Sequence, residues 1–144
     1  MKKSFLILTV LFLSTICTFG QNREEFHLPD HEQVEDMIGY THAVKIGSTL
    51  YISGTVDGRG EDMKSQMTKI YQSVDKTLQN YGVTSSAIVK ENIYTTDLES
   101  FKEQIPLRKG FYKEGIYPTS TWVQVERLFI PQLLVEMEFM AIVE

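Results

Sequence analysis

Two glutamates near the C-terminus, Glu136 and Glu138, have the types and spacing that could do chemistry. They alternate with apolar residues in "LLVEMEFMAIVE", so a strand would carry both carboxylates on one face. Two carboxylates this close could divide acid and base roles, because their repulsion raises the pKa of one of them. The alternative is that Glu136 alone faces a cleft while Glu138 pairs with Arg127 or Lys45.

Hydroxyl and aromatic side chains supply the remaining candidates for a ligand site. Ser53 in "YISGT" could orient a ligand oxygen or could be a turn residue before Gly54, and Ser120 lies in "YPTSTWVQVERL". No His or Lys stands where it would activate either serine as a nucleophile. Tyr40 and Trp122 could form an aromatic wall for a flat or apolar ligand, or could pack at a subunit interface.

The histidines favour structural roles over metal binding. His27 and His31 are four residues apart, a spacing that binds zinc on a helix. Pro29 lies between them and no third ligand is evident, so we predict no metal site. His42 stands beside Tyr40 and could reach the same ligand, although a hydrogen-bonded structural histidine is the favoured interpretation.

The bulk composition excludes several classes of partner. The chain has 144 residues, which suits one domain, and a net charge of −5 with scattered Lys and Arg. Binding of nucleic acid requires clustered cations, so we expect no nucleic-acid partner. Lys102, Arg108 and Lys109 are a candidate anion contact but are interpreted as surface. "DGRG" is too short for a phosphate-binding loop, and no cofactor is predicted.

The first twenty residues have the pattern of a secretory signal peptide. Two lysines precede an apolar run from Phe5 to Phe12, which is too short to anchor the chain in a membrane. Cleavage before Gln21 would remove Cys17, the only cysteine, and would change the net charge from −5 to −7. A lipoprotein site at Cys17 is the alternative, but the preceding Ile16 is bulky. We therefore expect a secreted or periplasmic protein.

The elements that must position these candidate residues have the sequence pattern of one small domain over residues 38–144. Residues 21–37 show no steady period and are interpreted as an N-terminal arm, partly ordered at best. "YTHAVKIGSTLYISGT" predicts two strands that form a hairpin around Gly47. Apolar residues at steps of three and four, from Met67 to Tyr81, predict an amphipathic helix.

The second half of the domain is predicted to add a strand, a helix and two further strands. "AIVKENIYTT" predicts a third strand, and a capping box of Thr96 and Glu99 opens a second helix that Pro106 should divide in two. "PTSTWVQVERL" and "LLVEMEFMAIVE" predict the last two strands. The order ββαβαββ favours a mixed α/β (α+β) domain with its two helices on one face of the sheet.

The last predicted strand has two apolar faces, and only one of them suits the helices. The simplest cover for the other face is another copy of the chain, which would leave a polar cleft where subunits meet. The helix face would carry Val135, Met137, Phe139, Ala141 and Val143, and the other face Leu134, Glu136, Glu138, Met140 and Ile142.

Three stretches resemble the reactive-intermediate deaminase family, RidA/YjgF: "GYTHAVKIGSTLYISGT", "IVKENIYTTDLESF" and "YPTSTWVQVERL…LLVEMEFMAIVE". The resemblance covers Ile38 to Glu144. It implies a chorismate-mutase-like fold and a homotrimer with three clefts between neighbouring subunits. Members of this family hydrolyse enamines and imines, such as 2-aminoacrylate, to 2-oxo acids and ammonia without a cofactor.

The resemblance also implies a set of site residues. Glu136 stands at the position of the family's water-handling glutamate, and Tyr40 and Ser53 stand at those of its cleft tyrosine and serine. Ser120 occupies the position of the arginine that clamps the substrate carboxylate. Trp122 stands where deaminases often have a small residue.

Two further departures concern the same cleft. The family's cleft asparagine falls at or near Ile105, and the "GY" entry lacks the proline common between those two residues. A serine offers one neutral hydrogen bond where a guanidinium offers a charged, two-pronged clamp. We therefore expect weak or no activity on 2-aminoacrylate.

These residues lead to a RidA-like protein that binds a small imine, enamine or carbonyl metabolite in an intersubunit cleft. The sequence leaves open whether it is an enzyme; if it is, it is a hydrolase or deaminase acting on C=N bonds. The alternative is a non-enzymatic ligand-binding or chaperone-like trimeric module. Ribonuclease activity, a label this family sometimes carries, is disfavoured by the acidic charge.

Overall fold

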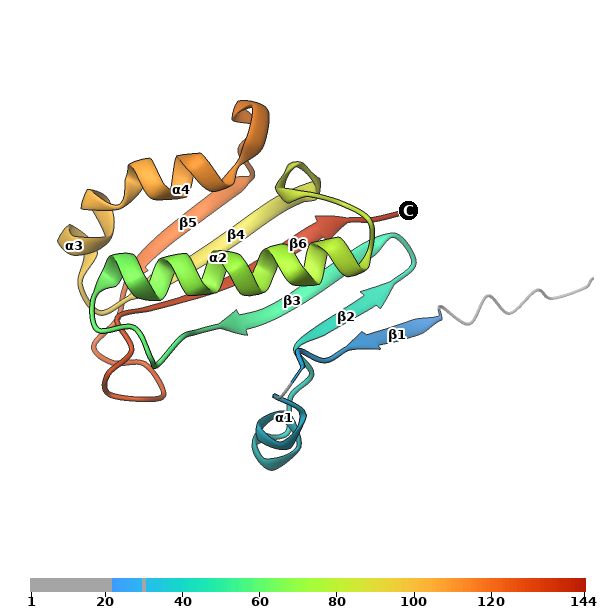
Figure 1. Ribbon diagram of the computed structural model, residues 1–144, viewed down its shortest axis with the longest axis horizontal. Coiled ribbons are helices and arrows are strands. Elements are labelled where there is room, and N and C mark those ends of the chain that lie inside the picture. The colour runs from blue at the N-terminus through green and yellow to red at the C-terminus, as the bar shows by residue number, and fades with distance from the viewer. Residues whose placement is uncertain (1–21, 30) are drawn as a thin grey trace, which may run out of the picture.

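A six-stranded sheet with the order β1-β2-β3-β6-β4-β5 forms the centre of the protein (Figure 1). The structure is a computed structural model that describes residues 22–29 and 31–144. The predicted signal peptide lies outside the described residues. The strands are β1 Arg23–Phe26, β2 Ala43–Ile46, β3 Thr49–Thr55, β4 Ile88–Thr95, β5 Thr119–Gln124 and β6 Val135–Ile142.

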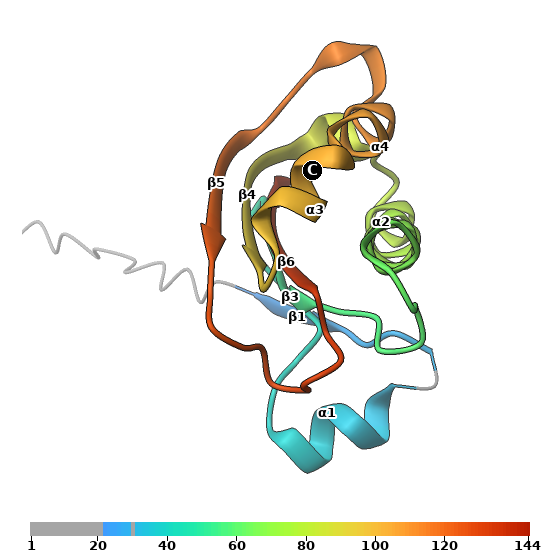
Figure 2. The same ribbon diagram turned by 90° about the vertical axis from the view of Figure 1, so that its left-hand side faces the viewer.

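The helices lie mainly on one side of this sheet. Figure 2 shows α2, α3 and α4 over one face, α1 at one end and the opposite face open. Strands β4 and β5 are parallel and the other pairs antiparallel, so the sheet is mixed as predicted. The helices are α1 Glu32–Ile38, α2 Met63–Asn80, α3 Leu98–Glu103 and α4 Ile105–Phe111, with short 3-10 turns at Ser85–Ala87 and Lys113–Gly115.

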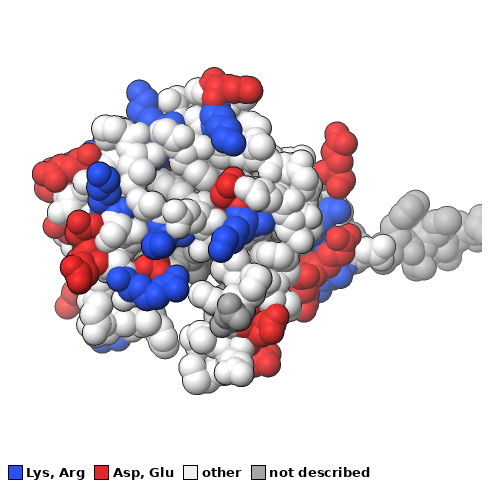
Figure 3. Space-filling view, viewed as in Figure 1, with Lys and Arg blue, Asp and Glu red and all other residues white. Residues whose placement is uncertain are grey.

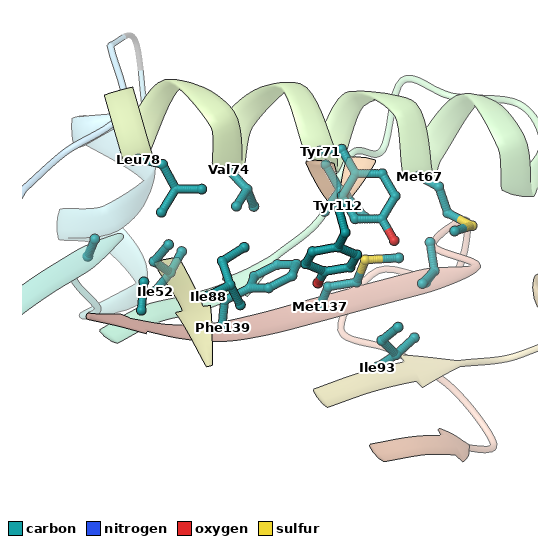
Figure 4. Close-up of a cluster of buried hydrophobic side chains, with 14 of the residues drawn as sticks. Ile52, Met67, Tyr71, Val74, Leu78, Ile88, Ile93, Tyr112, Met137 and Phe139 are labelled. Atoms are coloured by element: carbon teal, nitrogen blue, oxygen red, sulfur yellow. The ribbon is translucent and has the colours of Figure 1, made fainter. Parts of the chain in front are cut away.

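The long helix α2 closes the core, as its apolar spacing predicted. Asp62 caps its first turn by accepting a hydrogen bond from the Ser65 backbone N–H at 2.7 Å. The helix side of β6 is also buried, which confirms the predicted assignment of its two faces. In Figure 4 the apolar side chains of α2 point onto β6 and β3. The fully buried ones are Met67, Ile70, Val74 and Leu78.

Pro106 divides the next helical segment into α3 and α4, as predicted. The predicted cap at Thr96 is wrong, because Asp97 caps α3 by accepting from the Ser100 N–H at 3.0 Å. The Thr96 backbone N–H donates instead to the Leu134 carbonyl at 3.0 Å. Thr96 is therefore bound to the segment that enters β6 and is not free to cap the helix.

The segment interpreted as an N-terminal arm contains regular structure. Strand β1 pairs with β2 at the edge of the sheet, and α1 follows it. Glu35 of α1 is 1 % exposed, and its Oε2 accepts from His27 Nδ1 at 2.5 Å and from the His42 backbone N–H at 3.1 Å. A buried carboxylate with partners on both sides therefore anchors a helix that has no clear apolar period.

The open face of the sheet is partly apolar. Tyr51, Val123 and Ile142 are each more than 40 % exposed on their strands. Monomeric proteins rarely expose contiguous apolar patches of a large size, so this face suits contact with another chain. The homotrimer itself stays a prediction. Within residues 22–29 and 31–144, no helix has the length and apolarity that would let it cross a membrane.

His42 is expected to make the protein sensitive to acid. Its side chain is buried and Nε2 lies 2.9 Å from Thr77 Oγ1, whose O–H donates to the Ser73 carbonyl. Thr77 therefore accepts from a neutral His42, and burial lowers the pKa of His42 to about 4. The unfolded chain takes up the proton near pH 6.5, so stability present above pH 6.5 is lost as pH falls toward 4.

Urea unfolding between pH 7.5 and 4 would measure this loss, which is on the order of 3 kcal/mol in total. His42→Gln serves as the control, because glutamine can still donate to Thr77 but does not titrate. The difference between the two proteins should grow as the pH falls below 6.5. Parallel curves for the two proteins would show that His42 is not buried in its neutral form.

Candidate functional site

A β-bulge in β3 lies directly beside Glu136. Ile52 pairs with Phe139 of β6 and Thr55 pairs with Met137, so β3 holds one extra residue at Ser53–Gly54. A Cβ atom built on Gly54 would lie 2.0 Å from Glu136 Oε1. The carboxylate of Glu136 therefore rests against the backbone of the bulge, and a larger residue at position 54 would force the Glu136 side chain to move.

Tyr40, Ser53 and Glu136 line the same hollow, which has a volume of about 600 Å³. The structure thus brings together three of the five predicted site residues. The β3–α2 loop and the segment that precedes β6 reach this hollow from the same end of the sheet (Figures 1 and 2). Its apolar wall comes from α1 and from the segment before β6, and consists of Val34, Ile38, Phe129, Ile130 and Leu133.

Two hydroxyl groups in the hollow have defined roles as donor or acceptor. Ser53 Oγ donates to the Thr41 carbonyl at 2.7 Å, so it faces a ligand as an acceptor. Burial, with a smaller contribution from Glu35, raises the pKa of Tyr40 above its ordinary value. Tyr40 therefore keeps its proton at neutral pH and can donate to a ligand.

The two glutamates of β6 have different surroundings. Burial, and then repulsion by Glu138, raises the pKa of Glu136 above its ordinary value. Among the described residues no side chain or backbone group donates a hydrogen bond to Glu136, so water or a ligand can take that place. Glu138 accepts from the Asn92 amide and from the Tyr94 hydroxyl, the latter at 3.3 Å.

The predicted partners of Glu138 are therefore wrong. Lys45 Nζ lies 3.6 Å from Glu24 Oε1 and donates to the Glu144 carbonyl at 3.4 Å. Arg127 is exposed, and it has no ion pair among the residues that the structure describes. Pairing with Asn92 and Tyr94 keeps Glu138 as an acceptor, which leaves Glu136 as the candidate for proton transfer.

Ser120 and Trp122 do not line the hollow within one protomer. Their register against β4 places them opposite Glu91 and Ile93, on the helix face of the sheet. Ser120 Oγ donates to Glu91 Oε1 at 2.6 Å, and the Trp122 ring packs edge-on against Phe101 with centroids 5.0 Å apart. These two residues could meet Glu136 only across a subunit interface, as the resemblance implies.

A buried ion pair beside Ser120 was missed by the sequence analysis. Arg108 Nε donates to Glu91 Oε1 at 2.6 Å, and the Tyr112 hydroxyl donates to the other carboxylate oxygen. The guanidinium carbon lies 5.0 and 5.4 Å from the ring centroids of Tyr112 and Trp122. Arg108, interpreted from sequence as a surface cation, is 7 % exposed.

The alternation of residues in β4 could have predicted a buried partner for Glu91. Glu91 falls on the same strand face as Ile93, so an apolar face carries one carboxylate that needs a buried partner.

Two of the three histidines are engaged in structural contacts, while the third, His31, lines the hollow. His27 binds Glu35, and His42 binds Thr77, as its structural interpretation predicted. In the part of the chain that the structure describes, no group of three or more His, Cys, Asp or Glu side chains could hold a metal ion. Besides the carboxylate, the two hydroxyls and the apolar wall described above, charged groups of the β3–α2 loop also line the hollow.

Comparison with known families decides the identity of this fold. The family model described as "Endoribonuclease L-PSP" matches residues 31–143, a range that begins inside the segment interpreted as an arm. The chain belongs to the RidA/YjgF family. The likeness extends to a "RutC family protein" of Aquifex aeolicus, which is 31% identical over 110 residues, 72% of this chain and 87% of the relative.

A second relative and two solved structures point the same way. A "Putative reactive intermediate deaminase TdcF" of Escherichia coli is 30% identical over 97 residues, 62% of this chain and 75% of the relative. Rv2704 of Mycobacterium tuberculosis, a YjgF/YER057c/UK114 family member, has 30% identity and a TM-score of 0.75, covering 85% of this chain and 100% of its own. RidA from an Antarctic Psychrobacter has 29% identity and a TM-score of 0.66, with coverages of 72% and 88%.

Proposed function

We propose that the hollow around Glu136 binds a small imine, enamine or carbonyl compound, and that Glu136 positions the water that hydrolyses the C=N bond. The observation that supports this most is the half-buried carboxylate, which is set against Gly54, accepts from no donor among the described residues, and shares one hollow with Tyr40 and Ser53. Membership of the RidA/YjgF family is consistent with an imine deaminase-like reaction.

The proposed reaction needs only water and the chain's own residues. Glu136 takes a proton from a water molecule while the water oxygen forms a bond to the imine carbon. The π electrons of the C=N bond go to the nitrogen. The Tyr40 hydroxyl donates a hydrogen bond to the substrate, while Ser53 accepts one. Glu136 returns the proton taken from water to the nitrogen, which gives a carbinolamine. The glutamate then takes the hydroxyl proton and passes it to the nitrogen, so that the C–N bond breaks as the C=O bond forms and ammonia leaves a carbonyl product behind. A base with a raised pKa suits this task, because it takes a proton from water more readily than an ordinary carboxylate.

We also propose that the site is completed in a homotrimer. The partly apolar open face supports burial against other copies of the chain. In such an assembly the edge strand β5 would bring Ser120 and Trp122 of one subunit to the hollow of its neighbour, as the family resemblance implies. The signal-peptide pattern of residues 1–20 supports a secreted or periplasmic location as a further proposal.

The hollow favours substrates other than 2-aminoacrylate. Ser120 provides no cation for a carboxylate next to the C=N bond, and its hydroxyl proton is committed to Glu91. The apolar wall and a volume of about 600 Å³ suit a larger, apolar group. An aromatic imine without an adjacent carboxylate fits these two features better than a three-carbon acid.

An ammonia-release assay tests this preference. Benzylimine generated by an amine oxidase and 2-aminoacrylate generated by a lyase are supplied to the protein, with the uncatalysed hydrolysis subtracted. We expect the rate with benzylimine to exceed that with 2-aminoacrylate at least tenfold. Fast turnover of 2-aminoacrylate would contradict the argument from Ser120. Absence of turnover with both imines would favour a binding module without catalysis.

The charge distribution gives no support to nucleic-acid cleavage. On the face seen in Figure 3, basic and acidic side chains are interspersed and the basic ones form no continuous track. Proteins that bind the phosphate backbone cluster their Lys and Arg along such a track.

A further inference from the structure

We propose that Arg59 anchors an anionic group of the ligand, in place of the arginine that the family resemblance places at position 120. This inference rests on the proposed function, since it takes the hollow around Glu136 as the ligand site. Arg59 belongs to the β3–α2 loop and lines the same hollow as Tyr40, Ser53 and Glu136. It is thus a cation in that hollow within a single protomer.

The guanidinium of Arg59 is held in a defined orientation. Its Nε donates to Asp57 Oδ1 at 2.9 Å, and Asp57 Oδ2 accepts from the backbone N–H groups of Arg59 and Gly60 at 3.2 and 2.9 Å. Asp57 is 6 % exposed, whereas the Arg59 side chain is 80 % exposed. A buried carboxylate therefore fixes the Nε end of an exposed side chain that belongs to the lining of the hollow.

The loop that carries Arg59 is fixed to the rest of the site by Gln66 of α2. The buried Gln66 amide donates to the Gly60 carbonyl and to the Gln132 carbonyl, both at 3.0 Å, and its oxygen accepts from the Leu134 N–H at 2.8 Å. One side chain thus ties the β3–α2 loop to the segment that leads into β6 and Glu136. The position of Arg59 relative to Glu136 is therefore set by the scaffold.

The free end of Arg59 matches a carboxylate. Of the three guanidinium nitrogens of Arg59, only Nε contacts Asp57. Within residues 22–29 and 31–144, no oxygen accepts a hydrogen bond from the two terminal nitrogens. Those two nitrogens form the end-on fork that binds a carboxylate with two parallel hydrogen bonds. Aspartate and arginine neutralise each other in part, so the fork offers directed donors more than a strong net charge.

The place of Arg59 sets the class of ligand. The guanidinium is exposed at the rim, whereas Glu136 is half-buried against Gly54. A hollow of about 600 Å³ leaves room for a ring or a branched chain between these points. The ligand class is therefore a carbonyl or imine compound whose carboxylate is separated from the reacting carbon by an apolar segment.

Calorimetric titration with a stable probe tests the anchor without any turnover. The probes are 4-acetylbenzoate, whose carboxylate lies across the ring from its carbonyl, and the neutral 4-acetylbenzamide. For Arg59→Gln we expect the affinity for 4-acetylbenzoate to fall about tenfold or more, the range of a lost charge-assisted contact. The affinity for 4-acetylbenzamide should change less than about twofold. Arg59→Lys should lie between the wild type and Arg59→Gln, because it keeps the charge but loses the fork.

Arg127→Gln is the matched control, since it removes one exposed arginine near the same segment without touching the hollow. If Arg127→Gln weakened the binding of 4-acetylbenzoate as much as Arg59→Gln does, the effect would come from the overall charge of the protein, and the inference would be overturned. Unchanged affinity in Arg59→Gln, equal loss for the neutral probe, or no binding of 4-acetylbenzoate to the wild type would also overturn it. Binding that depends on Arg59 without any imine hydrolysis would instead count against the proposed function alone.

Discussion

Replacing Arg108 by methionine is expected to lower the free energy of unfolding by roughly 3–5 kcal/mol, the usual cost of breaking a buried ion pair on one side. Glu91 is fully buried and would lose the only cation in contact with it among the described residues. It would keep the hydroxyl donors Tyr112 and Ser120, which places the loss near the lower end. The side chain of methionine fills most of the space of the arginine stem.

Urea unfolding followed by tryptophan fluorescence measures this loss, because Trp122 is the only tryptophan and its indole N–H donates to Ser120 in the same cluster. Lys109→Met, an exposed change on the same helix, should cost less than about 0.5 kcal/mol. The double variant Glu91→Leu with Arg108→Met should recover much of the loss, since it leaves no buried charge unpaired. A loss below about 0.5 kcal/mol for Arg108→Met would show that the pair is not buried in solution.

Local patterns were sufficient to predict most of the sheet and its helices. The alternation in β6, the spacing in α2 and the proline in the first turn of α4 each reflect a requirement within one short segment. A strand or helix that buries one face repeats its apolar residues with the period of that element. Residues 38–144 are dominated by such elements, and their order was correct.

Elements held by contacts across the sequence could not be predicted in this way. Helix α1 depends on Glu35, whose partners His27 and His42 lie on either side of it in the chain. A carboxylate in a polar stretch gives no sign that it will be buried. The cap at Asp97 was missed for a related reason, because the contact of Thr96 with Leu134 joins residues far apart in the sequence.

The candidate site was predicted in part. Tyr40, Ser53 and Glu136 meet in one hollow, and the family resemblance was the source of that grouping. The alternation of β5 showed that Ser120 and Trp122 share a face, but the face depends on the register with β4. Register is a property of two strands, so one strand's sequence does not determine it. The bulge at Gly54 likewise depends on the pairing of β3 with β6, and the position of Arg59 depends on the contact of its loop with α2.

Replacing Glu136 by glutamine is expected to slow hydrolysis of the C=N bond by about 10²–10⁴-fold, the usual contribution of a positioned general base. Glutamine has the same shape and fits against Gly54, but it cannot take a proton from water. Burial and Glu138 raise the pKa of Glu136, so wild-type activity should increase with pH as Glu136 loses its proton. Stability should be unchanged or slightly higher, because the repulsion between two carboxylates is removed.

Glu138→Gln is the matched control, two residues away on the same face of the same strand. It removes the same charge, yet Glu138 is engaged with Asn92 and Tyr94 and is not placed to handle water. We expect its effect on the rate to stay below tenfold. An equal loss in both variants would assign the effect to the charge of this face and not to a base at position 136.

The rate of ammonia release from benzylimine by the wild type and by Glu136→Gln, at equal concentrations and with equal melting temperatures, tests the central claim most directly. If Glu136 acts as the base, the two rates should differ at least 100-fold, and the pH dependence of the wild type should be absent from the variant. A ratio near one would contradict a catalytic role for Glu136, and with it the proposal that this hollow hydrolyses C=N bonds.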